Sequence, residues 1–198
     1  DFLKDIDMTG RYYLLEGYLY PDTYDFYTGR KPEYYLCRLL DQFAKVFRQS
    51  KFFEAAEESE YTIDELLTIA SIIEKEAYQV NDFDMVSSVI HNRLKNPETY
   101  AKLECDSTIV YALSCIAGHR VTDITLEDLE LDNPYNSYKE EGLPPGPICS
   151  PSYNSIACAF DPAETDKTYY YFVSDKYGVM YYATTLKDHE KNIANKKK

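Results

Sequence analysis

The chain has 198 residues, enough for one domain with a substantial core, and its 44% hydrophobic and 28% charged residues are ordinary for a folded protein. A net charge of −13 argues against nucleic acid as a partner, because that affinity comes largely from Lys and Arg side chains that neutralise phosphates. No apolar run approaches the roughly 18 residues of a membrane span, and no signal-peptide pattern is present.

The first 80 residues of the chain are predicted to form one strand and two helices. Residues 12–27 are rich in aromatic side chains and broken by a proline, which predicts a strand leading into a turn. Residues 32–58 carry apolar side chains at helical spacing and predict one long helix. Thr62 and Glu65 then form a capping box, in which each side chain satisfies a free backbone N–H group of the next helix.

Shorter elements are predicted after residue 80. A proline-rich loop over residues 133–151 is too long for a plain connector and is a candidate binding loop. Two strands form a hairpin around residues 175–178, where Gly178 meets the need for a positive φ. The strands are expected at 169–174 and 179–184, and helices at 83–95, 107–115, 125–131, 152–160 and after Thr185.

Cysteine and histidine spacing predicts no metal site. The five cysteines include no C-x-x-C pair, and their odd number at irregular spacing favours buried free thiols over a disulfide framework. The three histidines form no H-x-x-x-H pair, so packing or surface roles are expected. The lysines at 196–198 are interpreted as a solvated tail.

The stretch SIIEKEA at residues 71–77 places two glutamates at the edges of an apolar helix face. On a helical wheel Lys75 points away from the apolar stripe, while Glu74 and Glu76 lie on its two borders. Both can be helix-favouring residues that cover the edge of the core. Alternatively, one lies in a half-apolar cleft, where desolvation raises its pKa and suits it to general acid catalysis. The helical wheel leaves both interpretations open.

Several motifs together carry a resemblance to a known family. They are LEGYLYPDTY at 15–24, ASIIEKEA at 70–77, NRL at 92–94 with DST at 106–108, and YNSY at 135–138 with GLPP at 142–145. In this order the chain resembles the MltG (YceG-like) family of endolytic murein transglycosylases. The resemblance continues through DPA at 161–163, YFVSD at 171–175 and TTLKDH at 184–189, and so covers almost the whole chain.

The predicted fold is α+β, with helices packed on a small antiparallel sheet and a lysozyme-like catalytic cleft. We expect a single catalytic domain over residues 1–198, with an N-terminal portion at 1–60 and a catalytic core at 61–198. The cleft is expected between the helix that carries Glu76 and the loop at 133–151.

The resemblance implies cleavage of the β-1,4 bond between N-acetylmuramic acid and N-acetylglucosamine within peptidoglycan glycan strands. The catalytic glutamate of the family, the second of its E-K-E motif, falls on Glu76. One carboxyl suffices, because the C6 hydroxyl of the substrate is the nucleophile and a 1,6-anhydro end forms. No metal or cofactor is required. Substrate contacts are expected from Glu16, Asn92, Arg93, Asp106, Thr108, Tyr135, Asn136 and Tyr138.

Each expected contact has a structural alternative. Asp106 could cap a helix, Arg93 could pair with a carboxylate, and Asn136 could shape a turn. Two other functions also remain open. One is a muramidase that hydrolyses the same bond with water, which needs Glu74, Asp106 or Glu16 as a second carboxylate. The other is a non-enzymatic wall-binding or scaffold module.

The resemblance also implies a location and partners. Action is expected at the outer face of the bacterial cytoplasmic membrane, on peptidoglycan strands and beside the cell-wall synthesis machinery. The membrane helix and LysM-like region of the family normally precede this part, so membrane attachment is expected only through a segment outside these 198 residues.

Overall fold

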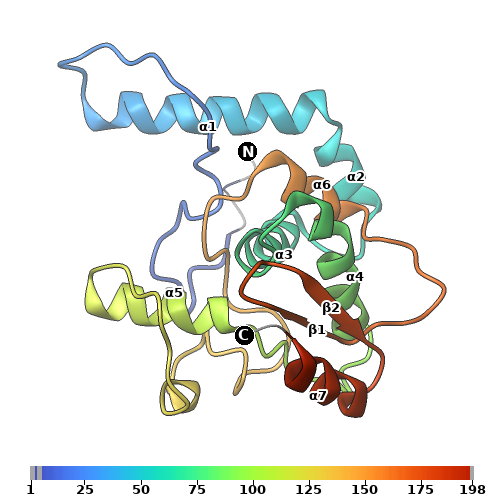
Figure 1. Cartoon of the computed structure of the whole chain (residues 1–198). Coiled ribbons are helices and arrows are strands. Elements are labelled where there is room, and N and C mark those ends of the chain that lie inside the picture. The colour runs from blue at the N-terminus through green and yellow to red at the C-terminus, as the bar shows by residue number, and fades with distance from the viewer. Residues whose placement is uncertain (1–2, 4–5, 197–198) are drawn as a thin grey trace.

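The computed structural model describes residue 3 and residues 6–196, which form the predicted α+β fold of helices on a small antiparallel sheet (Figure 1). Strands β1 (Tyr171–Ser174) and β2 (Met180–Ala183) pair as an antiparallel hairpin. The helices are α1 (Pro32–Gln49), α2 (Phe52–Glu58), α3 (Ile63–Glu76), α4 (Phe83–Leu94), α5 (Asp106–Ala117), α6 (Tyr153–Phe160) and α7 (Leu186–Asn195), with 3₁₀ turns η1 (Val80–Asp82) and η2 (Asp128–Glu130).

Helix α3 is the centre of the fold. Every residue from Leu66 to Ile73 is buried, which is typical of a helix surrounded by protein on all sides. It packs against α4, α5 and α6 (Figure 1). The two glutamates of the EKE motif follow this buried stretch, at the C-terminal end of α3.

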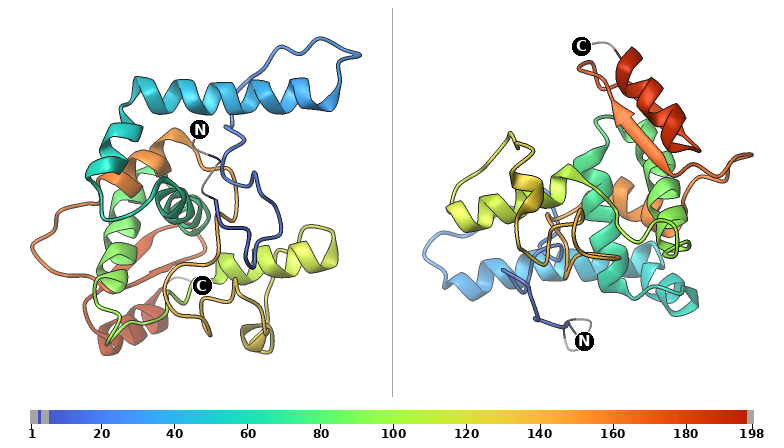
Figure 2. Two further views of the ribbon diagram at one scale, coloured as in Figure 1. Left: turned by 180° about the vertical axis from the view of Figure 1, so that it is seen from behind. Right: turned by 90° about the horizontal axis from the view of Figure 1, so that it is seen from below.

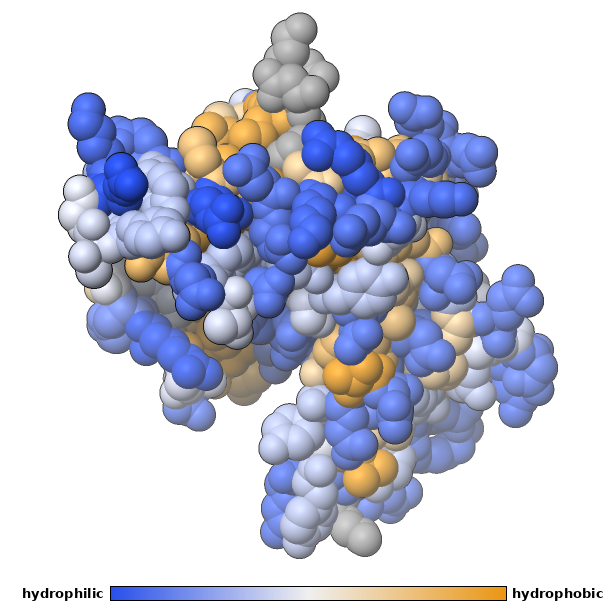
Figure 3. Space-filling model, turned by 90° about the horizontal axis from the view of Figure 1, so that it is seen from above, coloured by the Kyte–Doolittle hydropathy of each residue, from blue (hydrophilic) through white to orange (hydrophobic). Residues whose placement is uncertain are grey.

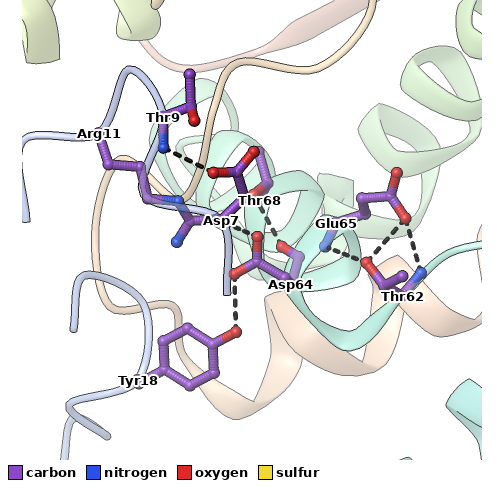
Figure 4. A network of polar contacts seen from close by, with 8 residues as sticks. All are labelled: Asp7, Thr9, Arg11, Tyr18, Thr62, Asp64, Glu65 and Thr68. Carbon is purple, nitrogen blue, oxygen red and sulfur yellow. Dashed lines mark hydrogen bonds and ion pairs between the residues drawn. The ribbon is translucent and has the colours of Figure 1, made fainter. Parts of the chain in front are cut away.

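A polar network fixes the N-terminal end of α3 (Figure 4). The Glu65 N–H donates to the Thr62 hydroxyl at 3.2 Å and the Thr62 N–H donates to the Glu65 carboxylate at 2.8 Å, so the predicted capping box is confirmed. Arg11 pairs with the Asp64 carboxylate, and the Tyr18 hydroxyl donates to it at 2.7 Å. These contacts hold the segment that precedes α1 against the central helix.

The strand predicted over residues 12–27 is wrong, because the described chain is irregular there. Tyr18 and Tyr20 are buried, and the Tyr12 ring stacks on the Tyr135 ring with centroids 5.7 Å apart. The aromatic side chains that suggested a strand serve tertiary packing instead, which overrides strand propensity.

The single helix predicted over residues 32–58 is also wrong. Helix α1 ends at Gln49, Lys51 adopts a left-handed φ of 58°, and α2 begins at Phe52. The break turns the chain so that the Phe47 and Phe52 rings meet edge to face, 5.3 Å apart. Both rings belong to the core.

The remaining predicted elements are present with small shifts at their ends, except that the helix predicted over residues 125–131 is only the 3₁₀ turn η2. All five cysteines are free thiols, as predicted, but only Cys105 is buried and Cys37 is exposed. Lys197 and Lys198 of the predicted tail lie outside the described residues. Within the described residues, no helix is both long enough and apolar enough to span a membrane.

Candidate active site

Three adjoining cavities form a groove beside the C-terminal end of α3. The first, of about 760 Å³, lies between residues 74–78 and residues 174–178 of the hairpin. The second, of about 290 Å³, shares Glu76 and Ser174 with the first. The third, of about 260 Å³, shares Glu104 and Tyr138 with the second. Neighbouring cavities share lining residues, and the three together are called the groove below.

The hairpin and α7 form a lobe that stands apart from α5, as the view from below in Figure 2 shows. The space-filling view in Figure 3 shows a deep notch between the lower lobe and the rest of this face. The predicted cleft placed the loop at 133–151 opposite the α3 helix, and Tyr138 of that loop does line the second cavity. The sequence prediction did not include the β1–β2 hairpin, whose residues 174–178 line the first cavity opposite the end of α3.

Glu76 lies where the first and second cavities meet. It is half-buried at the last position of α3, and its carboxylate accepts the Ser107 N–H from the first turn of α5 at 3.1 Å. Burial raises the pKa of this carboxyl; the bond from Ser107 opposes the rise and the nearby Asp106 charge adds to it. Glu76 thus keeps its proton to higher pH than an ordinary glutamate, as a general acid requires.

Glu74 has a different environment. One of its carboxylate oxygens accepts three hydrogen bonds, from the Ser152 N–H at 3.1 Å, the Ser152 hydroxyl at 2.6 Å and the Ser155 hydroxyl at 2.7 Å. These donors lie at the N-terminal end of α6. Although Glu74 also lines the first cavity, its bonds fasten α3 to α6. The structure therefore distinguishes two glutamates that the helical wheel left equivalent.

Asp106 and Tyr138 are brought together with Glu76 in the second cavity. The Tyr138 hydroxyl donates to the Asp106 carboxylate at 2.6 Å. Burial raises the pKa of Tyr138 far above its ordinary value, so the phenol remains a protonated donor. This arrangement holds a second carboxylate near Glu76.

Thr108, Tyr135 and Asn136 are buried and line none of the three cavities. The Thr108 hydroxyl donates to the Cys105 carbonyl at 2.7 Å. The Asn136 amide donates to the carbonyls of residues 129 and 131, at 2.9 and 2.7 Å. These side chains shape the loop and the helix start that carry Tyr138 and Asp106.

Asn92 and Arg93 tie α4 to the segment that leads into β1. The Asn92 amide donates to the Tyr169 carbonyl at 3.0 Å, and the Arg93 guanidinium donates to the Tyr170 carbonyl at 3.0 Å. Arg93 also pairs with the Glu104 carboxylate at 2.5 Å. It lines the third cavity, whereas Asn92 is absent from the described lining of the groove.

Glu16 is half-buried in the irregular segment before α1. It interacts with Tyr111 on α5 and with the charge of Lys75, and burial raises the pKa of its carboxyl. Among the described residues that line the three cavities, Glu16 does not occur.

The sequence prediction missed groove residues near the C-terminus. Phe172, Ser174, Met180 and His189 line the second cavity together with Glu76. The motifs YFVSD and TTLKDH contain three of the four, but neither motif indicated a role for them. In the described part of the chain, no group of three or more His, Cys, Asp or Glu side chains is placed to hold a metal ion.

Comparison with known proteins identifies relatives of this chain. A family model described as the YceG-like family matches residues 3–195. An endolytic murein transglycosylase of Bacillus subtilis is 37% identical over 182 residues, which cover 89% of this chain and 46% of that protein. An endolytic murein transglycosylase of Streptococcus pneumoniae serotype 2 is 34% identical over 190 residues, covering 94% of this chain and 33% of that protein. The chain therefore spans less than half the length of either relative.

The fold also matches a solved structure. A crystal structure of a YceG-like protein from Listeria monocytogenes superposes with a TM-score of 0.82 at 36% identity. The match covers 92% of this chain and 56% of that one.

Proposed function

The chain belongs to the YceG-like family, and from this premise we propose that it is the catalytic part of an endolytic murein transglycosylase. The proposed reaction cleaves the β-1,4 bond between N-acetylmuramic acid and N-acetylglucosamine inside peptidoglycan glycan strands. One observation carries the proposal: Glu76 is a half-buried carboxyl of raised pKa that lines two neighbouring cavities. The two relatives named as endolytic murein transglycosylases support the reaction class.

In the proposed mechanism Glu76 acts first as an acid and then as a base. Its carboxylic acid gives a proton to the glycosidic oxygen as the bond from that oxygen to C1 of N-acetylmuramic acid breaks. The resulting carboxylate takes the proton of the C6 hydroxyl as that oxygen bonds to C1. A 1,6-anhydro end forms, no water is consumed, and Glu76 returns to its protonated state.

Neighbouring groups prepare this chemistry. The Ser107 N–H holds one oxygen of the Glu76 carboxyl and stabilises its charged form after the first proton transfer. The Asp106 carboxylate, held by the Tyr138 hydroxyl, is a negative group beside the site where the sugar ring develops positive charge. The groove itself orients a linear polymer across Glu76.

A hydrolytic muramidase is the second candidate, because Asp106 lines the same cavity as Glu76. Of the three carboxylates that this alternative could use, Glu74 is bonded to α6 and Glu16 is absent from the described lining of the groove. Asp106 would then activate a water molecule on the opposite face of the sugar.

The products distinguish the two reactions. Purified peptidoglycan is digested with the protein, and the released fragments are weighed by mass spectrometry. The transglycosylase reaction predicts anhydro ends, one water lighter than hydrolysis products. Reducing ends would instead assign the muramidase reaction, and intact strands would contradict both enzymatic proposals in favour of a wall-binding module.

The proposed setting is the outer face of the cytoplasmic membrane, where peptidoglycan strands are the substrate. Attachment to the membrane through a segment outside this chain, and association with the cell-wall synthesis machinery, belong to the same proposal. The relatives support the choice of murein as substrate.

A further inference from the structure

Two exposed tyrosines line the largest cavity of the groove. Tyr78, two residues after Glu76, is 81% exposed, and Tyr177 in the hairpin turn is 61% exposed. Both line the first cavity, and the proposed reaction at Glu76 uses neither. Val80 and Val179, each two residues further along the chain, are also exposed. Two exposed aromatic side chains among polar groups in one cavity suit a binding surface.

The Tyr78 ring packs against the hairpin turn. Gly178 has a φ of +79°, and a Cβ added to it would lie 2.6 Å from Cδ1 of the Tyr78 ring. Only glycine therefore lets the turn approach the ring so closely. The Asp175 carboxylate in turn accepts the N–H groups of Tyr177 and Val179, at 2.9 and 3.0 Å. An ordered turn therefore lies against the Tyr78 ring at the first cavity.

The chemistry around the two rings fits a sugar. A pyranose presents C–H groups on its faces and hydroxyl or amide groups at its rim, so it complements an aromatic face with polar neighbours. Lys75 and Lys176 line the same cavity and supply donors for that rim. The Lys176 ammonium also lies 5.2 Å from the centroid of the Tyr177 ring and restrains it. The cavity opens directly onto Glu76, so a strand bound there reaches the proposed catalytic carboxyl.

We propose that Tyr78 and Tyr177 form a saccharide-stacking subsite that holds the glycan strand on the first-cavity side of the bond to be cleaved. The inference rests on the proposed function, because the glycan is placed by its passage over Glu76. It adds two binding residues, one on the segment after α3 and one on the hairpin, that none of the motifs carrying the family resemblance assigns.

Binding is measured in the Glu76→Gln protein, so that cleavage does not consume the probe. The probe is a soluble, peptide-free oligomer of alternating N-acetylglucosamine and N-acetylmuramic acid, titrated by calorimetry. We expect Tyr78→Ala and Tyr177→Ala each to raise the Kd about fivefold to tenfold. This is the typical contribution of one aromatic stacking contact to the affinity. The phenylalanine variants keep the ring and are expected to stay within about twofold of the parent.

Tyr27→Ala is the matched control, because Tyr27 is 70% exposed in the loop before α1 and lines none of the three cavities. An unchanged Kd in both alanine variants would overturn the subsite while leaving cleavage by the wild type to support the proposed function. An equal loss in the control would also overturn it. If Tyr78→Ala fails to fold, Tyr177→Ala decides the question, since its ring lies in an exposed turn.

Two further results are diagnostic. The titration is repeated with oligomers that carry stem peptides. If the alanine variants bind only these oligomers more weakly than the parent does, the cavity is assigned to the peptide and the sugar subsite is overturned. A wild-type protein that neither binds nor cleaves the glycan would overturn the proposed function, and the subsite with it.

Discussion

The pKa of the Glu76 carboxyl reflects opposing influences. Burial favours its protonated form, whereas the Ser107 N–H at the start of α5 favours the carboxylate. The residue is also the last of α3, where the negative end of the helix dipole faces the charge. Because burial dominates, the pKa is raised, and the site suits the transfer of a proton in both directions.

Glu76→Gln is expected to stabilise the folded protein at pH 7. A raised pKa means that the folded state binds the proton more tightly, so stability falls as pH rises from about 4.5, the ordinary value, through the raised pKa. Glutamine removes this loss while its oxygen can still accept the Ser107 N–H. Urea denaturation should show a gain of about 1 kcal/mol at pH 7 and little gain at pH 3.5. A variant less stable than the wild type at pH 7 would contradict this account.

Glu74→Ala is expected to act on stability rather than on chemistry. It removes the acceptor of three hydrogen bonds from Ser152 and Ser155, so the free energy of unfolding should fall by about 2 kcal/mol. Urea denaturation measures the loss. Lys75→Ala, at an exposed position on the same helix, is the control and should change stability by less than about 0.5 kcal/mol. A Glu74→Ala protein as stable as this control would show that the bonds to α6 contribute nothing.

The role of each glutamate could be predicted only in part from the residues themselves. Periodicity placed Glu74 and Glu76 on the borders of the apolar face. Which border meets α5 and which meets α6 depends on tertiary packing, which no local pattern contains. The same limit explains Thr108 and Asn136, whose polar side chains were expected in the groove but satisfy backbone groups in the interior instead.

At the scale of elements, the sequence predicted helix boundaries that depend on neighbouring residues and missed those that depend on tertiary contacts. The capping box of Thr62 and Glu65 is built from neighbouring residues and marked the start of α3 correctly. The break between α1 and α2 depends on Lys51, a non-glycine residue in a left-handed conformation, and no sequence signal marks it. Core contacts of Phe47 and Phe52 maintain that conformation, so the sequence alone indicated an unbroken helix.

Lys51→Gly is expected to be neutral or stabilising. Glycine adopts a positive φ without the steric cost that lysine has there, and this gain of roughly 1 kcal/mol is partly offset by the greater freedom of the unfolded chain. Lys45→Gly, an exposed position within α1, is the control of opposite sign and should cost about 1 kcal/mol. Thermal denaturation of both variants tests the comparison. If both variants lost the same stability, the left-handed backbone conformation of Lys51 would carry no strain.

At the scale of the whole molecule, the segment before α1 is held to the central helix by buried polar contacts. The Arg11 side chain is 1% exposed and pairs with Asp64, which also accepts the Tyr18 hydroxyl. The Tyr12 ring stacks on Tyr135 of the loop that carries Tyr138. The N-terminal portion is thus packed against the part that forms the groove, while the division of the chain at residue 60 stays a prediction.

Asp64→Asn is expected to lower the free energy of unfolding by about 3 kcal/mol, because it leaves the buried Arg11 guanidinium without its carboxylate. Glu60→Gln removes the partner of Lys95 in an exposed ion pair and should cost less than about 1 kcal/mol. Urea denaturation of the two variants compares a buried with an exposed pair. Similar small losses would show that Arg11 does not anchor the N-terminal segment.

The central claim is that Glu76, and not Glu74, carries the chemistry of the groove. The most direct measurement is the rate at which anhydro ends appear when purified peptidoglycan is digested with the wild type, Glu76→Gln and Glu74→Gln, each at the same folded concentration. We predict that Glu76→Gln lowers this rate by at least about 100-fold, the usual size of a general acid contribution, whereas Glu74→Gln stays within about tenfold of the wild type. Full activity in Glu76→Gln together with its loss in Glu74→Gln would contradict the assignment.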